Sequence, residues 1–197
     1  MEILKELNVE KLNIVESDGT VKMSLFNGKN MPKLFFEGEE IFPGHRQDDN
    51  TAGLMFYDEN GVECGGLIFG GKDGVHSMGL TMDKQNNDQV LQLASMETPQ
   101  GHRYGIKLYQ RPDKTMKQYE EEIKLLSTLP AEEAKKLEEK MAVEHATRLS
   151  IMREVNGRVG ITLYDSNGKE RIVMAVDEND NPIIKILDNK GDTIKEL

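Results

Sequence analysis

The sequence contains one cysteine, Cys64, and no tryptophan. A single cysteine cannot form an internal disulfide, so a reducing compartment is the simpler expectation. No segment approaches the roughly 18 consecutive apolar residues that a membrane-spanning helix needs. The first residues, MEILKELNVEKLNIVESDG, include several acids and lack the uninterrupted apolar run of a secretory signal. These absences predict a cytoplasmic protein.

Positive charge is also scarce and is spread along the chain. Lys and Arg number 25 against 35 Asp and Glu, and the formal net charge is −10. Nucleic acids and anionic membranes both bind through a concentrated positive face. We therefore expect neither a nucleic acid nor a membrane as a partner.

Short alternating strands separated by Asn-Gly and Asp-Gly turns dominate the sequence. Glycine, asparagine and aspartate tolerate the positive φ angles of tight hairpins. The pattern predicts hairpins over residues 12–27, 53–69, 67–82 and 159–176, and another around Lys190-Gly191. Hairpins at such spacing indicate a mainly β, antiparallel architecture.

Two hairpin segments align with a constant offset of 107 residues. GLMFYDENGVECGGLIF and GITLYDSNGKERIVMAV share Gly53/Gly160, Tyr57/Tyr164, Asp58/Asp165, Asn60/Asn167 and Gly61/Gly168. An internal duplication into two similar β halves is the expected cause. In the second copy the run KERIVMAV is almost continuously apolar, which predicts that both faces of this strand are covered.

A segment between the two copies has a different composition. Residues 115–149 are rich in Glu, Lys, Leu and Ala, contain no glycine, and show helical periodicity. Pro130 suits the beginning of a second helix. The chain is thus predicted to consist of an N-terminal β-hairpin region (1–112), a helical hairpin insert (113–148) and a C-terminal β-hairpin repeat (149–197).

The stretch ECGGLIFGGKDG, residues 63–74, contains the spacing G-x-x-x-x-G-K of a phosphate loop. A phosphate loop also needs Ser or Thr after the lysine and a helix that begins there. Here Lys72 is followed by Asp73 and then by alternating residues, which favours a hairpin. Similarly, DENDNP (177–182) has oxygen ligands at EF-hand positions but Pro182 where the loop requires glycine, which also favours a turn.

The loop FPGHRQDDNTAG, residues 42–53, carries the candidate binding site. His45, Arg46, Asp48 and Asp49 fall together where Pro43 and Gly44 break the chain, and loops often carry function. A histidine beside two carboxylates can act as a general base or help to hold a metal, whereas a charged loop with internal Arg-to-Asp pairing is the plainer interpretation. The pair His102 and Arg103 repeats the GHR sequence, and the two His-Arg pairs could converge on an anion. Cys64 is expected to be a buried apolar residue.

Several motifs together resemble a known family. The segments KLNIVESDGTVKMSLFN, PGHRQDD, AGLMFYDENGVECGGLIFGG and LYDSNGKERIVMAVDENDNPIIKILDNKGD are similar to a family of small uncharacterised bacterial proteins of unknown function with repeated β-hairpins. The resemblance implies a bacterial source. It supplies no activity, cofactor or catalytic residue.

Turn chemistry and strand packing account for almost all of the distinctive residues. We therefore expect a non-enzymatic β-rich scaffold or binding protein, without cofactor or metal, that forms a homo-oligomer because open strand edges and apolar faces need cover. The alternative is a small-ligand-binding protein or an enzyme that uses the loop of His45, Arg46, Asp48 and Asp49, so the question of catalysis stays open.

Overall fold

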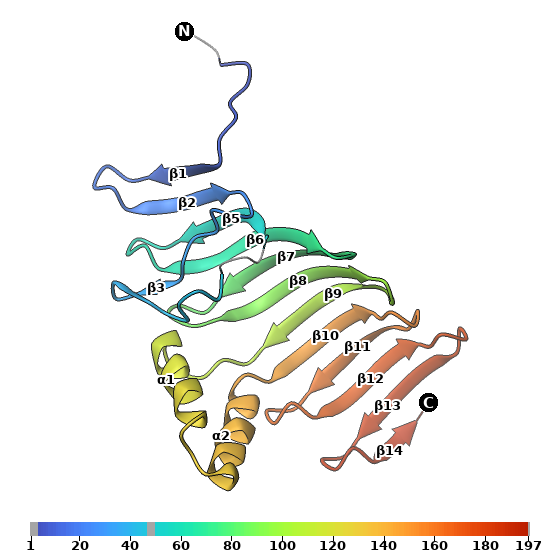
Figure 1. Cartoon of the computed structure of the whole chain (residues 1–197). Coiled ribbons are helices and arrows are strands. Elements are labelled where there is room, and N and C mark those ends of the chain that lie inside the picture. Colours follow the sequence, from blue (N-terminus) through green and yellow to red (C-terminus); the bar gives the residue numbers. More distant parts are fainter. Residues whose placement is uncertain (1–3, 47–49, 197) are drawn as a thin grey trace.

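The fold is seen in a computed structural model that describes residues 4–46 and 50–196. Twelve strands form one sheet in which every neighbouring pair is antiparallel, in the order β1-β2-β5-β6-β7-β8-β9-β10-β11-β12-β13-β14. Figure 1 shows the sheet as a single continuous layer that runs from the N-terminal to the C-terminal strand. The predicted mainly β architecture with an inserted helical hairpin is confirmed.

The strands of the first part of the chain include one short separate pair, β3 with β4. The strand bounds are β1 Lys11–Val15, β2 Val21–Phe26, β3 Phe35–Phe36, β4 Glu39–Glu40, β5 Ala52–Tyr57, β6 Glu63–Lys72, β7 Val75–Asp83, β8 Gln89–Thr98 and β9 Gly101–Tyr109. The second part contributes β10 Thr147–Arg153, β11 Val159–Tyr164, β12 Glu170–Val176, β13 Pro182–Leu187 and β14 Thr193–Glu196. Strand β9 pairs directly with β10, so the two β regions form one sheet.

Seven hairpins share one hydrogen-bonding pattern. In each turn, the N–H of the first residue donates a hydrogen bond to the carbonyl oxygen of the residue four positions later. The carbonyl oxygen of the same first residue accepts a hydrogen bond from the N–H of the residue three positions later. The first residues of the seven turns are Glu16, Asp58, Lys84, Glu154, Asp165, Asp177 and Asp188. Where the first residue is aspartate, its Oδ1 also accepts backbone N–H groups inside the turn, as in Asp177 with Asn179 and Asn181. Residues 177–182 therefore form a hairpin turn, as predicted, and not an EF-hand loop.

The glycine-rich stretch forms the strands β6 and β7, as predicted. The turn between them consists of Asp73 and Gly74, which both have positive φ angles, 53° and 81°, the signature of a type I′ turn. Gly65 has φ 132°, and a Cβ atom there would overlap the Thr81 carbonyl oxygen. The glycines thus allow close strand pairing, and no helix follows Lys72.

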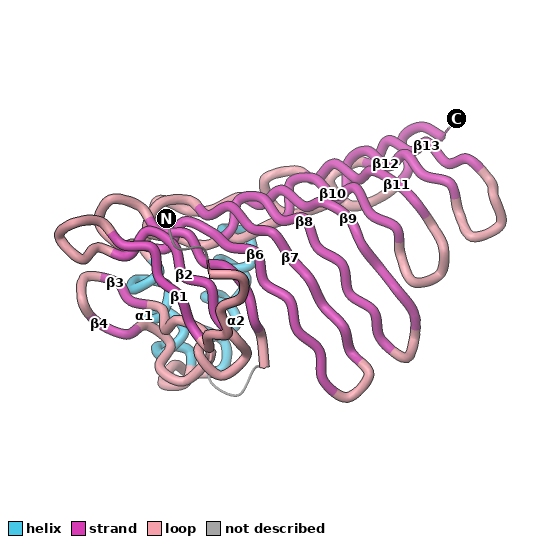
Figure 2. Tube along the Cα trace, turned by 90° about the horizontal axis from the view of Figure 1, so that it is seen from above, coloured by secondary structure: helices cyan, strands magenta, loops and turns pink. Residues whose placement is uncertain are grey.

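The inserted segment forms two helices, α1 (Met116–Leu126) and α2 (Ala131–Glu144). Thr115 caps α1 and forms a capping box with Gln118, and Pro130 immediately precedes α2. Figures 1 and 2 place both helices beside the ends of β9 and β10, on one side of the sheet. The predicted break between the helices is confirmed.

The core of the chain lies on only one face of the sheet. Phe26 and Met55 point to the face that the segment 28–46 covers, where they are buried together with Phe36 and Ile41. Thr162 and Val173 are also buried on this face, as cross-strand partners. We call this side, which carries the core, the covered face.

Candidate functional site

The structure describes two of the predicted loop residues, His45 and Arg46, and both have hydrogen-bond partners within the protein. Arg46 donates two hydrogen bonds to the Glu63 carboxylate, 2.7 and 2.8 Å long, and a third, 3.1 Å long, to the Pro32 carbonyl. His45 is exposed, and its Nδ1 lies 2.9 Å from the Phe42 carbonyl oxygen. Arg46 therefore anchors the covering segment 28–46 to β6. Asp48 and Asp49 lie outside the described residues.

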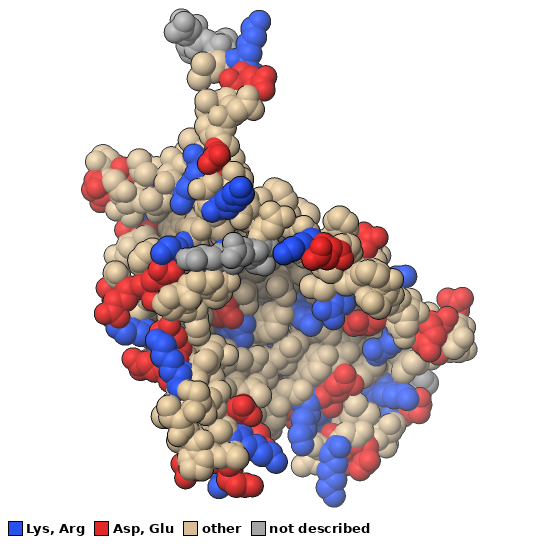
Figure 3. All heavy atoms as spheres, viewed as in Figure 1, with Lys and Arg blue, Asp and Glu red and all other residues tan. Residues whose placement is uncertain are grey.

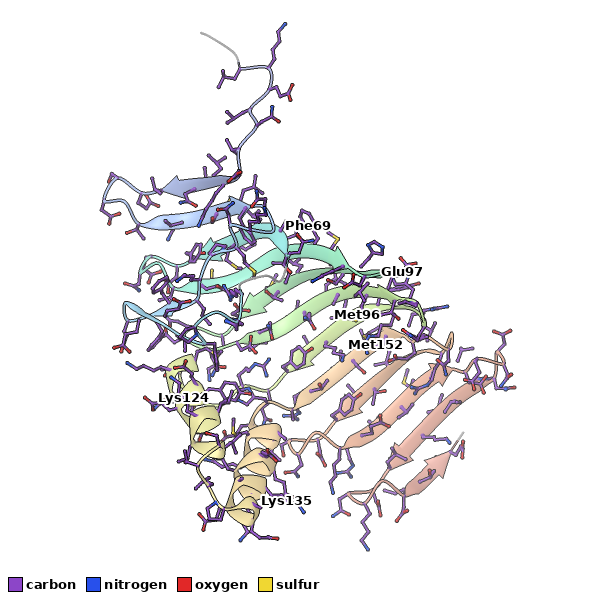
Figure 4. All side chains as sticks on the ribbon, viewed as in Figure 1. Phe69, Met96, Glu97, Lys124, Lys135 and Met152 are labelled. Atoms are coloured by element: carbon purple, nitrogen blue, oxygen red, sulfur yellow. The ribbon has the colours of Figure 1, made fainter. Side chains whose placement is uncertain are left out.

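His102 and Arg103 lie near the beginning of β9, at the opposite edge of the sheet from Glu63. His102 follows the turn that joins β8 to β9, and its Nε2 is 2.7 Å from the Ser95 hydroxyl. Arg103 is exposed and contacts the sulfur of Met96 at 3.5 Å, which Figure 4 places far from the helical hairpin. Because Glu63, the partner of Arg46, begins β6 at the opposite edge, the structure does not bring the two His-Arg pairs together.

A cluster of charged side chains lies beneath the covering segment and includes Arg46 and Glu63. Burial, together with the nearby carboxylates of Glu63 and Asp88, raises the pKa of Asp83 to about 7. Its Oδ1 is buried and has no hydrogen-bond partner among the described residues. Arg111 contacts Asp88 at 3.3 Å. Among the described residues, no three His, Cys, Asp or Glu side chains are placed to hold a metal ion.

His145 and Cys64 also have defined surroundings. The His145 ring packs on Tyr119 with ring centroids 4.4 Å apart, and Arg111 Nη1 lies 3.3 Å from its Nδ1. Burial, reinforced by the Arg111 charge, lowers the pKa of His145. Cys64 is exposed, which corrects the expectation that it is buried. It is the additional residue of a β-bulge between the pairs Tyr57/Glu63 and Phe56/Gly65.

The outstanding feature of the structure is the uncovered face of the sheet, which we call the apolar face. One row of cross-strand partners crosses it on eleven strands without a single polar side chain: Leu12, Leu25, Leu54, Leu67, Leu80, Leu93, Ile106, Ile151, Ile161, Met174 and Ile184. The next row is Ile14, Met23, Phe56, Gly65, Met82, Leu91, Leu108, Leu149, Leu163, Ile172 and Ile186.

Many of these side chains are open to solvent. Leu93 is 48% exposed, Met82 53% and Met174 47%. A third row contributes Phe69, Met78, Tyr104, Val159 and Val176, all of which are exposed, but Ser95 and Arg153 interrupt it. None of the buried apolar residues of the described chain lies in these rows. Strand β12, whose two faces were both expected to be covered, has Val173 buried on one side and Ile172, Met174 and Val176 exposed on the other.

Residue identity alone did not reveal this face, because the rows become visible only when the strand register is known. A signal was nevertheless present. Five turns at one edge of the sheet share a spacing: the residues two and four positions before the first turn residue belong to the two apolar rows. Before Asp58 these residues are Phe56 and Leu54, and before Asp165 they are Leu163 and Ile161.

No family model matches the sequence, and no curated protein is significantly similar to it. The helices of the described residues are too short or too polar to cross a membrane. Interpretation of function therefore starts from the apolar face and from the pockets of this chain.

Proposed function

We propose that this chain is a non-enzymatic scaffold protein that functions as a homo-oligomer, in which copies pack through their apolar faces. The observation that supports this proposal is the pair of rows without polar side chains that crosses eleven strands. An exposed apolar patch of this continuity marks an interaction surface, because exposure of apolar side chains to water is unfavourable in proportion to area.

The size of the apolar face fits a stable protein interface. Neighbouring strands lie about 4.8 Å apart and successive residues on one face about 6.8 Å apart, so two rows over eleven strands cover on the order of 650 Å². The partial third row brings the face close to the roughly 800 Å² that each partner contributes to a standard interface. The largest apolar patch of a typical monomer is about 300–600 Å².

A second copy of the chain is the occupant that these properties favour. Two antiparallel sheets pack face to face when both faces are apolar and lack charges, and identical chains satisfy this requirement automatically. An isologous contact also lets both copies bury the same surface in a closed assembly. An anionic membrane is disfavoured because the chain carries a net charge of −10.

The test is the mass of the protein in solution, measured by light scattering during size-exclusion chromatography. One chain has a mass of 22.3 kDa, and the isologous contact of two apolar faces predicts a dimer. Leu93→Glu places a charge in the centre of the apolar face and is expected to give monomers or to reduce soluble protein. Leu125→Glu is the matched control, because Leu125 is 47% exposed on α1, outside the apolar face, against 48% for Leu93. A wild-type mass of one chain that is unchanged on tenfold concentration would refute the proposal.

A further inference from the structure

A second surface feature lies on the other side of the sheet. An open cavity of about 480 Å³ lies between β1, the beginning of β2 and the segment 29–35, and Tyr57 and Glu63 also line it. Ser24 and Asn13, which line the cavity, are cross-strand partners on the covered face. Their sequence neighbours Leu12 and Leu25 belong to the apolar face, so this cavity stays open when apolar faces pack together. Its volume is in the range of small-molecule sites.

The cavity is basic although the chain as a whole is acidic. Three lysines line it, Lys11, Lys29 and Lys33. Lys33 pairs with Glu40 at 2.7 Å, whereas Lys11 and Lys29 form no ion pair within the part of the chain that the structure describes. In Figure 3, Lys and Arg side chains gather on the molecular face over β1 and β2.

Among the residues that the structure describes, Glu63 is the one carboxylate of the lining, and its charge is already compensated. Both oxygens of Glu63 accept hydrogen bonds from Arg46. The charges of Lys11 and Lys29 are therefore the uncompensated charges of the cavity.

A buried hydroxyl without a partner gives independent support for a ligand. Ser24 is only 1% exposed, and its Oγ has no hydrogen-bond partner within residues 4–46 and 50–196. A buried polar group without a partner is unfavourable, and native proteins rarely keep one without a reason. The Tyr57 hydroxyl, also in the lining, forms no hydrogen bond with any described residue, and burial raises the Tyr57 pKa so that it stays a donor.

The lining also has an apolar part beside the polar Asn13 and Asn30. Val21, Met31 and Phe35 contribute carbon surface, which suits the carbon skeleton of an organic molecule. Inorganic ions would leave this surface without contact. A ligand with both an acidic group and a carbon skeleton matches all parts of the wall.

We propose that this cavity binds a small organic anion, a carboxylate or a phosphate ester. The acidic group lies between Lys11 and Lys29, where two ammonium groups compensate its charge. A polar group of the ligand forms hydrogen bonds with Ser24 and Tyr57. Binding at this site does not require assembly through the apolar face.

Isothermal titration of the full-length chain at low ionic strength tests the proposal. Citrate and glucose 6-phosphate serve as separate anionic probes, which distinguish a carboxylate from a phosphate ligand, and glucose is the uncharged control. We expect at least one anion to saturate one site per chain and glucose to give no signal. If neither anion saturates, or if glucose binds equally well, the proposal is wrong.

Substitutions locate the binding site. The double variant Lys11→Gln/Lys29→Gln is expected to weaken binding at least about tenfold. Lys135→Gln/Lys136→Gln is the matched control, because both lysines are exposed on α2, where Figure 4 shows Lys135 far from β1 and β2. Equal losses in the two double variants would show general charge attraction and overturn the assignment.

Ser24→Ala supplies the second measurement. It removes the buried hydroxyl without introducing bulk or charge, so the fold is expected to persist, which circular dichroism verifies. We expect binding to weaken roughly five- to tenfold, as the loss of one hydrogen bond predicts. Unchanged affinity in a folded variant would contradict the role of Ser24 as a ligand contact.

Discussion

Arg46 and Glu63 form a doubly hydrogen-bonded ion pair that ties the covering segment to the first residue of β6. The two bonds are 2.7 and 2.8 Å long, and the side chains are only 14% and 13% exposed. Planar guanidinium and carboxylate groups match each other in this geometry. Arg46 was predicted as a site residue, and the structure shows that it anchors the covering segment, which contributes Phe36 and Ile41 to the core.

Removal of one partner of this pair is expected to be costly. Arg46→Gln leaves the Glu63 carboxylate partly buried without a counterion, and we expect the free energy of unfolding to fall by about 2–4 kcal/mol. Urea denaturation followed by circular dichroism measures it. Lys185→Gln, which breaks an exposed pair with Glu196, is the control and should change stability by less than about 1 kcal/mol. Equal effects of the two substitutions would contradict the anchoring role.

The raised pKa of Asp83 predicts that the free energy of unfolding depends on pH in a specific way. Its pKa is about 7 in the folded chain against an ordinary value of 3.8, so the folded state retains its proton while the unfolded state has released it. This group therefore lowers stability progressively as the pH rises from about 4 to 7. Asp83→Asn removes the titration, and we expect it to be stabilising by roughly 1–3 kcal/mol at pH 8 and near neutral at pH 4.

Thermal or urea unfolding at several pH values checks this prediction. The informative quantity is the difference between the variant and the wild type, because other carboxylates titrate in both proteins. A difference that stays constant between pH 4 and pH 8 would show that Asp83 ionises normally.

Gly65 is expected to tolerate no side chain. Its φ angle of 132° disfavours other residues, and a Cβ would overlap the Thr81 carbonyl of β7. We expect Gly65→Ala to reduce the free energy of unfolding by more than about 1 kcal/mol. Gly79→Ala is the matched control in β7, because the nearest atom to its Cβ, the Leu93 carbonyl oxygen, lies 3.8 Å away. A substitution at Gly79 as harmful as that at Gly65 would point to a different register.

The glycine stretch predicts the absence of nucleotide binding. Lys72 is the last residue of β6 and pairs with Val75 across a two-residue turn, so no helix N-terminus faces a phosphate group. Titration of ATP and GTP with magnesium, followed by calorimetry, should give no heat of binding. A micromolar signal that disappears in Lys72→Ala would require another interpretation of this turn.

Local chemistry made much of the fold predictable. Asn60-Gly61, Asp73-Gly74 and Asn167-Gly168 located three hairpins correctly, because the positive φ angles needed in these turns restrict the residue choice. The helical periodicity of residues 115–149, the absence of glycine there and the position of Pro130 located both helices. These features depend on residues that are close in sequence.

Properties that depend on distant residues were not predictable. Arg46 was expected to pair with the aspartates of its own loop, yet its partner Glu63 lies 17 positions away. Ser24 lines a cavity only because the segment 29–35 folds back over β1 and β2. Cys64 belongs to a bulge, which shifts the alternation of β6 by one residue and therefore exposes a side chain that strict alternation would bury.

The shared turn geometry has a consequence for how the length of this protein can change. At one edge of the sheet, each of five turns is followed by a β-bulge at the same offset, so that the register of the pairing shifts next to Ile14, Phe56, Met82, Leu163 and Ile186. A complete two-strand unit therefore joins its neighbours with the same register wherever it stands in the order. Gain or loss of such a unit lengthens or shortens the sheet by a fixed step and leaves every other side chain on its own face. The width of the apolar face is thus a quantity that evolution or an engineer can adjust in steps of one hairpin.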